Sequence, residues 1–288
     1  MSSARFSNRL GNICRRVARW CGAPEISQRR IGRFLETVNG EIGPLRGRTP
    51  PATVSVVIPC FGHASFLTTA LTSIVNQSRL PDEVIAVDDC SPDATGAILK
   101  EHLEKLGASD KVRCSILTND RNRGQAFSLN RAIAESGSDL VMILNDDDYL
   151  VPDAVELMLD LFRRQRDVVL IGGTSVRFTR DDQLTKLSET CPAPRAGGMV
   201  ELSVRMPADV PGYRSYNDLN MTHSGCCFLK SAWKAVGGYN PDKRTRVVPF
   251  SDRDFQLRVN ALFPVAVCSE VPFSCWRSGS SVDCGRDS

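Results

Sequence analysis

The chain has 288 residues, enough to bury one large core, and its 42% hydrophobic and 24% charged residues exclude a chain too polar to fold. Its eleven cysteines are odd in number and include no C-x-x-C pair, which excludes a disulfide scaffold and zinc-finger spacing and indicates reduced thiols in the cytoplasm. No apolar run of 18 residues and no continuous apolar leader are present, so we expect neither a membrane span nor a secretory signal.

The net charge of +3 is divided unevenly along the chain. Residues 1–50 hold ten arginines and three acidic residues, about +7, whereas the rest holds 26 basic and 30 acidic residues, about −4. Over residues 6–20 apolar positions recur at helical spacing with arginines between them, which predicts a basic helical N-terminal extension followed by a linker. Residues 1–35 could contact an anionic membrane surface, or form a solvated or docked helix without a membrane role, and the composition leaves both open. Nucleic-acid binding through the arginine-rich extension is another possibility, although we expect no nucleic-acid partner.

From Thr53 onward, short apolar strands alternate with amphipathic helices. Strands that are apolar throughout are typical of a parallel sheet covered on both faces, which predicts an α/β, Rossmann-like, mostly parallel sheet flanked by helices. We expect one domain over residues 51–288, with a loop-rich stretch over residues 179–222 that could recognise a ligand. The expected strands are Val54–Ile58, Val84–Val87, Val112–Leu117, Leu140–Leu144 and Val168–Ile171, and the expected helices are 64–78, Thr95–Leu106, Gln125–Ser136 and Asp153–Gln165.

Two acidic clusters follow strands of this expected sheet. Asp88 and Asp89 come directly after the second strand, and the triplet Asp146–Asp148 follows the fourth. Ligands of open α/β sheets bind outside the carboxyl ends of the strands, so we expect the two clusters to meet at one edge. Three consecutive carboxylates repel one another, and a divalent cation with oxygen ligands would relieve the repulsion and could bridge a diphosphate. Helix capping is the alternative explanation, although a cap needs only one carboxylate.

The order of these segments resembles that of the inverting family 2 glycosyltransferases, which have the GT-A fold. The resemblance runs from Val54 to about Ser281, and the order and spacing of its motifs make it specific. No G-x-G-x-x-G motif follows the first strand, which disfavours a nicotinamide-dependent oxidoreductase, and the loop after that strand lacks the glycine-rich basic sequence of a nucleotidyltransferase. The motifs are Val54-Ser-Val-Val-Ile-Pro-Cys-Phe61, Val87-Asp-Asp-Cys-Ser-Pro-Asp93, Asn122-Arg-Gly124 with Leu129-Asn-Arg-Ala-Ile133, Asn145-Asp-Asp-Asp-Tyr-Leu-Val-Pro152, Gly237-Gly-Tyr-Asn240 and Ser251-Asp-Arg-Asp-Phe-Gln-Leu-Arg258.

The resemblance implies a role for each matched position. It implies a nucleotide pocket, a metal site that holds Mg²⁺ or Mn²⁺ and through it the donor diphosphate, and a general base that deprotonates the acceptor hydroxyl. Asp147 is the best single candidate for a metal ligand, because Asn145 occupies a position that is often acidic in the family. The implied sites are the donor nucleotide at Pro59, Cys60, Phe61, Asp88, Asp89, Arg123 and Asp146, the metal at Asp147 and Asp148, the base at Asp252, the acceptor side at Gly237, Gly238 and Asp254, and closure over the diphosphate at Trp276 and Arg277.

The sequence departs from the family pattern near the base and in the terminal segment. Ser251 stands where an acidic residue usually precedes the base, which leaves Asp252 itself in place. Many relatives carry a histidine in the terminal segment as an extra metal or phosphate contact, and here that contact falls to Arg277 or to no residue, because the three histidines are His63, His102 and His223. Plainer alternatives remain for three sites: a helix cap at Asp252, a structural turn at Gly237 and Gly238, and a solvated side chain at Arg123.

These features predict an inverting, metal-dependent glycosyltransferase of the hexosyltransferase type. It would move a sugar from a UDP, GDP or dTDP donor to an acceptor hydroxyl on a polysaccharide, a glycolipid or another glycan. A lipid-linked acceptor would suit a cytoplasmic enzyme that lies at the inner face of the membrane. The alternative is a catalytically inactive relative that serves as a binding or scaffold protein, and the presence of Asp88, Asp147 and Asp252 argues against it.

Overall fold

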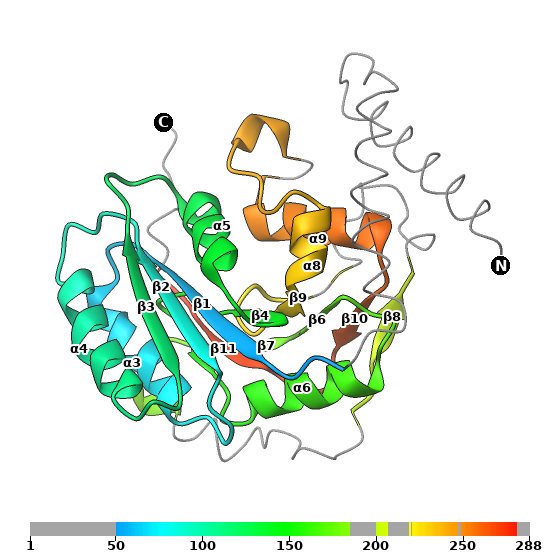
Figure 1. Ribbon diagram of the computed structural model, residues 1–288, viewed down its shortest axis with the longest axis horizontal. Helices are drawn as coiled ribbons and strands as arrows, with labels where there is room; N and C mark the ends of the chain where they lie inside the picture. Colours follow the sequence, from blue (N-terminus) through cyan, green and yellow to red (C-terminus); the bar gives the residue numbers. More distant parts are fainter. Residues whose placement is uncertain (1–49, 185–199, 207–218, 220, 247–248, 281–288) are drawn as a thin grey trace.

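The computed structural model describes residues 50–184, 200–206, 219, 221–246 and 249–280 (Figure 1). The predicted basic extension, apart from Pro50, and the membrane contact predicted for residues 1–35 therefore lie outside the described residues. So does much of the predicted loop-rich stretch, whose described part includes the short strand β8, Ser203–Arg205. None of the described helices is long and apolar enough to cross a membrane.

An eight-stranded sheet runs, from edge to edge, through β3 (Arg113–Thr118), β2 (Glu83–Asp88), β1 (Val54–Cys60), β4 (Leu140–Ile143), β9 (Cys227–Leu229), β6 (Leu170–Gly173), β10 (Val265–Cys268) and β8. The first four strands are parallel to one another, and β6 is parallel to β10. β9 is antiparallel to both of its neighbours and joins the two parallel sets, and β8 is antiparallel at the far edge. The predicted α/β fold with a mostly parallel sheet is confirmed.

Helices cover both faces of this sheet, as the apolar strands predict. On one face lie α3 (Ala64–Val75), α4 (Thr95–Gly107) and α6 (Ala154–Arg164), and on the other lie α5 (Gln125–Glu135), α8 (Lys230–Ala235) and α9 (Ser251–Leu262), as Figure 1 shows. Every residue of β1, β2 and β4 is buried between these layers. β3 differs from the prediction because it is an edge strand, and its residues are exposed or half-buried.

A second, three-stranded sheet brings the C-terminal strand next to the residues that follow the acidic triplet. It consists of β5 (Tyr149–Leu150), β11 (Ser274–Arg277) and β7 (Ser175–Phe178), with β11 in the middle. β11 pairs antiparallel with β5 and parallel with β7. Because β5 begins one residue after the triplet, this pairing places β11 at the triplet.

The nine strands and helices predicted between Val54 and Ile171 all form, with ends shifted by at most three residues. The cysteines among the described residues are all free.

Candidate functional site

Asp89 lies directly after β2, at the edge where the carboxyl ends of the parallel strands meet. The residue is 3% exposed. Its Oδ1 accepts hydrogen bonds from Asn119 Nδ2 (2.6 Å) and the amide of Arg123 (2.9 Å), and its Oδ2 accepts from the amide of Gly124 (2.7 Å). Gly124 has a φ of 84° directly before α5, a conformation that favours glycine. Asp89 therefore fixes the loop that enters α5.

Asp88 and Cys60 end the neighbouring strands β2 and β1. Asp88 Oδ1 accepts a hydrogen bond from the amide of Ser91 (2.9 Å). Gly96 allows the first turn of α4 to approach, because a Cβ atom there would lie 3.0 Å from Asp88 Oδ2. Cys60 is buried, and burial raises the pKa of its thiol well above the ordinary value, so it packs as a neutral side chain.

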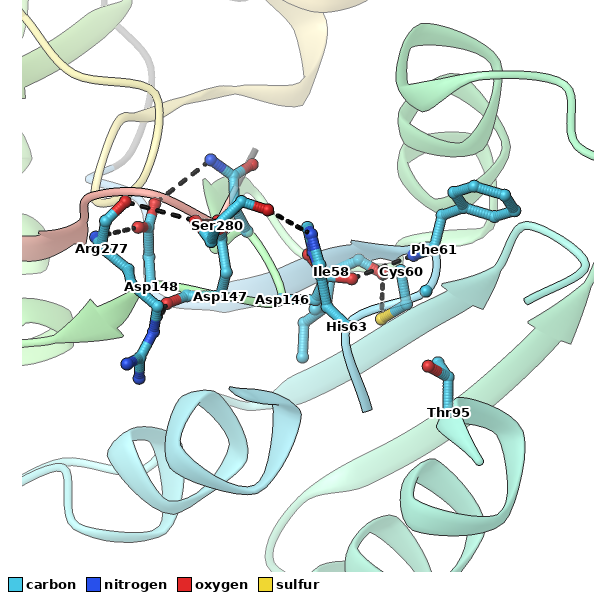
Figure 2. Close-up of polar contacts among 12 residues, drawn as sticks. Ile58, Cys60, Phe61, His63, Thr95, Asp146, Asp147, Asp148, Arg277 and Ser280 are labelled. Carbon is cyan, nitrogen blue, oxygen red and sulfur yellow. Dashed lines mark hydrogen bonds and ion pairs between the residues drawn. The ribbon is translucent and has the colours of Figure 1, made fainter. Parts of the chain in front are cut away.

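Asp146 joins the end of β4 to the loop after β1 (Figure 2). Its Oδ2 accepts a hydrogen bond from the amide of Phe61 (2.9 Å), and its Oδ1 lies 2.8 Å from Nδ1 of His63. The other ring nitrogen of His63, Nε2, lies 3.0 Å from the carbonyl oxygen of Ser280. The hydrogen bond to Asp146 raises the pKa of His63 to about 9, while burial raises the pKa of Asp146. Because both ring nitrogens face oxygen acceptors, a protonated His63 beside an ionised Asp146 fits these contacts.

Asp148 lies toward β11 rather than toward His63. Its Oδ1 accepts a hydrogen bond from the amide of Arg277 (2.9 Å), and its Oδ2 accepts from Ser224 Oγ (2.5 Å) and Asn145 Nδ2 (3.2 Å). The residue is 2% exposed, and burial, followed by the charge of the neighbouring aspartate, raises its pKa to about 7. Both oxygens of Asp148 thus hold protein segments together.

Asp147 is the half-buried member of the triplet. Its Oδ2 accepts a hydrogen bond from Ser280 Oγ. Potential ligand atoms of His63, Asp146 and Asp147 lie within 4.8 Å of one another, and among the described residues Asp148 is not part of this group. Carboxylate oxygens suit Mg²⁺ and Mn²⁺, and an imidazole nitrogen suits transition ions, so these donors fit a divalent cation.

Arg277 contacts the triplet through its backbone amide and its Nε, and the rest of its guanidinium is held by other residues. Its Nε donates to the carbonyl oxygen of Asp147 (3.0 Å), and the guanidinium lies between the rings of Phe66 and Phe178, 4.5 and 4.4 Å from their centroids, and binds Asp181. Figure 2 shows it pointing away from the carboxylate of Asp148. The neighbouring Trp276, by contrast, is 48% exposed.

Asp252 lies half-buried in the first turn of α9, whose N-cap position is Phe250. Ser251 Oγ donates to Gln125 Oε1 (3.4 Å), and Gln125 Nε2 donates to Asn145 Oδ1 (3.1 Å). These two bonds link the start of α9 to the residue before the triplet. The residue before Asp252 and the residue before the triplet are therefore connected through Gln125.

The turn Gly237–Gly238 is held from two helices. Both glycines have a φ of 76°, and a Cβ on Gly238 would lie 2.6 Å from Asn130 Oδ1 of α5. From α9, Arg258 donates to the carbonyl oxygen of Gly238 (2.7 Å) and pairs with the fully buried Asp254 (2.9 Å). Asp254 thus orients Arg258, and through it the turn.

His223 and Tyr239 form a buried pair beside α9. His223 Nε2 lies 3.2 Å from Tyr239 Oη, and the Tyr239 ring stacks on Phe255 with centroids 4.3 Å apart. Burial lowers the pKa of His223, and the charge of Asp252 acts in the opposite direction. The imidazole is therefore held in its neutral form.

Arg123 directs its guanidinium along the protein surface. Its Nε donates to Asp120 (2.9 Å), and its guanidinium carbon lies 4.9 Å from the centroid of the Phe127 ring. Its backbone amide, rather than its side chain, faces Asp89.

The sequence model described as glycosyl transferase family 2 matches residues 55–232, more than half of the chain. This chain belongs to glycosyl transferase family 2. The match includes the Asp88–Asp89 pair and the acidic triplet, whereas Asp252 and β11 lie beyond it.

Curated relatives of this family 2 chain include proteins of polysaccharide synthesis. The succinoglycan biosynthesis protein ExoO of Rhizobium meliloti is 29% identical over 158 residues, which cover 50% of this chain and 43% of ExoO. The chondroitin synthase of Escherichia coli is 31% identical over 211 residues, which cover 73% of this chain and 27% of the synthase. The chain spans less than half the length of these relatives.

Among solved structures, S. aureus TarS in complex with UDP-GlcNAc superposes with a TM-score of 0.59 at 15% identity, over 80% of this chain and 60% of that chain. This similarity confirms the GT-A fold predicted for the family 2 chain.

Sequence reasoning missed residues that complete the site of this family 2 chain. His63 stands two residues after the predicted nucleotide loop, and its place in the short segment between the first strand and the first helix was the available signal. Gln125 was assigned to a helix and given no role. Ser224 and Ser280 gave no signal, because a serine is informative only when its partner is known.

Proposed function

We propose that this chain transfers a sugar from a nucleotide sugar to a glycan hydroxyl with inversion at the anomeric carbon. The observation that supports it most is the single arrangement in which Asn145, Gln125 and Ser251 link the acidic triplet to the helix that bears Asp252. ExoO and chondroitin synthase are named for polysaccharide synthesis, and TarS is solved with UDP-GlcNAc, which supports a nucleotide-sugar donor.

On the donor side, backbone groups and carboxylates are held in place at the edge of the sheet where the parallel strands end. Asp89 holds the loop before α5, and Asp88 lies beside the first turn of α4, so both can shape the nucleotide pocket together with Phe61. A bound Mg²⁺ or Mn²⁺ would supply Lewis-acid stabilisation of the charge that develops on the leaving nucleoside diphosphate. Asp147 and its neighbours in the cluster would hold it, because their donor atoms lie within 4.8 Å of one another.

On the acceptor side, Asp252 is the proposed general base. Inversion requires a base that removes the proton of the acceptor hydroxyl as the oxygen attacks the anomeric carbon. Asp252 lies half-buried in the first turn of α9. The turn Gly237–Gly238, fixed by Asn130 and Arg258, is the proposed boundary of the acceptor site.

The acceptor we propose is a growing polysaccharide or a lipid-linked glycan, handled in the cytoplasm. Residues 1–35 would then provide a peripheral membrane contact. Sedimentation with anionic liposomes should retain the full chain and release a chain that lacks residues 1–50. Equal partitioning of the two would contradict the membrane part of the proposal.

Thermal stabilisation by nucleotides tests the donor site. We expect one of UDP, GDP and dTDP to raise the melting temperature only with Mn²⁺ or Mg²⁺, because the diphosphate and the carboxylates need the cation between them. Asp147→Asn should lose the metal-dependent part of this shift, and Asp110→Asn, an exposed acid in the turn after α4, should keep it. A protein that no nucleotide stabilises would instead be an inactive binding or scaffold relative.

A further inference from the structure

His63 occupies the loop between β1 and α3 and turns its ring toward the acidic triplet (Figure 2). Its Nε2 atom lies 3.0 Å from the carbonyl oxygen of Ser280. A carbonyl oxygen only accepts hydrogen bonds, so Nε2 carries the proton in this contact. When the His63 ring is neutral, Nδ1 is therefore the nitrogen with the free lone pair.

Nδ1 is the atom that faces the carboxylates. It lies 2.8 Å from Asp146 Oδ1, and the donor atoms of His63, Asp146 and Asp147 lie within 4.8 Å of one another. Adjacent ligands of a six-coordinate cation with bonds of about 2.1 Å stand roughly 3 Å apart. The 2.8 Å between Nδ1 and Asp146 Oδ1 matches this separation, and the wider spacing within the group means that its donors would draw closer around a bound ion. A histidine that binds a metal commonly donates its other ring N–H to a backbone carbonyl, as Nε2 does here.

We propose that His63 is a nitrogen ligand of the divalent cation at this site, beside Asp146 and Asp147, and that it makes the site prefer Mn²⁺ to Mg²⁺. This inference rests on the proposed function, because it names the cation that the donor site takes. On binding, Nδ1 releases its proton to solvent, and its hydrogen bond to Asp146 is replaced by a bond from each side chain to the cation. The bond from Nε2 to Ser280 remains and fixes the ring.

The preference follows from ligand chemistry. Mg²⁺ selects oxygen donors and keeps much of its water, whereas an imidazole nitrogen favours first-row transition ions. The other two histidines have different partners: Nδ1 of His102 contacts the carbonyl of Ile98 within α4, and His223 contacts Tyr239. His63 is thus the imidazole that the fold brings to the triplet.

Pulsed electron paramagnetic resonance of bound Mn²⁺ tests the assignment without measuring turnover. The full chain would be loaded with Mn²⁺ together with UDP, GDP or dTDP, in samples with natural and ¹⁵N-labelled histidine. We expect a nitrogen coupling that changes with the label. A wild-type Mn²⁺ complex that shows only oxygen ligands would overturn the inference. If a nucleotide still stabilised that protein in the presence of Mn²⁺, the proposed function would stand.

Two variants distinguish metal binding by His63 from a purely structural role of this residue. In His63→Gln the side-chain amide can still donate to Ser280 O but offers no nitrogen ligand, so the nitrogen coupling should vanish. The ratio of the Mg²⁺ dissociation constant to that of Mn²⁺ should fall at least about tenfold, comparable to other losses around metal sites. His102→Gln should leave both unchanged. An unchanged ratio in a folded His63→Gln protein, or a coupling that persists in it, would show that His63 does not bind the cation.

Discussion

Gln125 Nε2 donates a hydrogen bond to Asn145 Oδ1, 3.1 Å away, and so connects the first residue of α5 to the residue before the acidic triplet. On its other side, Gln125 Oε1 accepts from Ser251 Oγ at 3.4 Å. The resemblance to the family implies acidic residues at two of these positions, where this chain has Asn145 and Ser251. If both positions were acidic, Gln125 would meet a carboxylate on each side. Its Oε1 is a hydrogen-bond acceptor, as a carboxylate is, so the two sides of the amide could not both pair in this way. The two departures are therefore matched to each other through Gln125.

Removing this bridge should slow sugar transfer. Gln125→Leu keeps most of the side-chain volume but breaks both hydrogen bonds, so α9 and the triplet lose their common support. We expect kcat/KM to fall by about 10- to 100-fold, the scale of a small misplacement of reacting groups. Gln165→Leu, at the exposed C-terminal end of α6, is the matched control. Wild-type rates in Gln125→Leu would show that the bridge does not position Asp252.

Replacement of the proposed base should separate chemistry from donor binding. Asp252→Asn cannot accept the proton of the acceptor hydroxyl, so we expect transfer to fall by about 10²-fold or more. The metal-dependent shift of the melting temperature by the nucleotide should stay near that of the wild type, because no donor residue is altered. Asp110→Asn provides the control for loss of a carboxylate. Transfer at the wild-type rate would remove Asp252 from the mechanism.

The first half of the fold could be predicted closely from the sequence. Residues 54–173 form repeated units of an apolar strand and an amphipathic helix, and the two periodicities differ clearly. The second half could not, because β9 is three residues long and pairs antiparallel between β4 and β6. Nothing in so short a segment indicates which strands it joins.

The sequence predicted which residues form the candidate site but not which residues they contact. The resemblance singled out Asp146, Asp147 and Asp148 together, and the fold gives each a different partner: His63, Ser280 and the amide of Arg277. These partners come from segments distant in the sequence, so spacing along the chain has no information about them. The resemblance also suggested that Arg277 makes the contact that a histidine makes in many relatives. In the fold, the guanidinium of Arg277 lies beside the rings of Phe66 and Phe178, and the sequence alone does not indicate these two contacts.

Asp89 should stabilise the protein as well as shape the donor pocket. Its carboxylate accepts three hydrogen bonds, two of them from the backbone, and an asparagine could not reproduce them because its amide nitrogen would face N–H donors. We expect Asp89→Asn to lower the free energy of unfolding by about 1.5–3 kcal/mol, as measured by urea denaturation. Asp120→Asn loses only an exposed ion pair with Arg123 and should change the free energy of unfolding far less. Equal effects of the two would contradict this role of Asp89.

His223 should make the folded state sensitive to acid. Burial lowers its pKa below that of the unfolded chain, and the nearby charge of Asp252 offsets this only in part. Below about pH 6.5 the unfolded chain therefore binds a proton that the folded protein does not, and stability falls as the pH falls. The loss from this group can reach about 1.4 kcal/mol per pH unit until the folded pKa is reached. In His223→Gln, whose amide can still contact Tyr239 Oη, urea denaturation between pH 5 and 8 should show a shallower decline. An unchanged decline would mean that His223 does not titrate on unfolding.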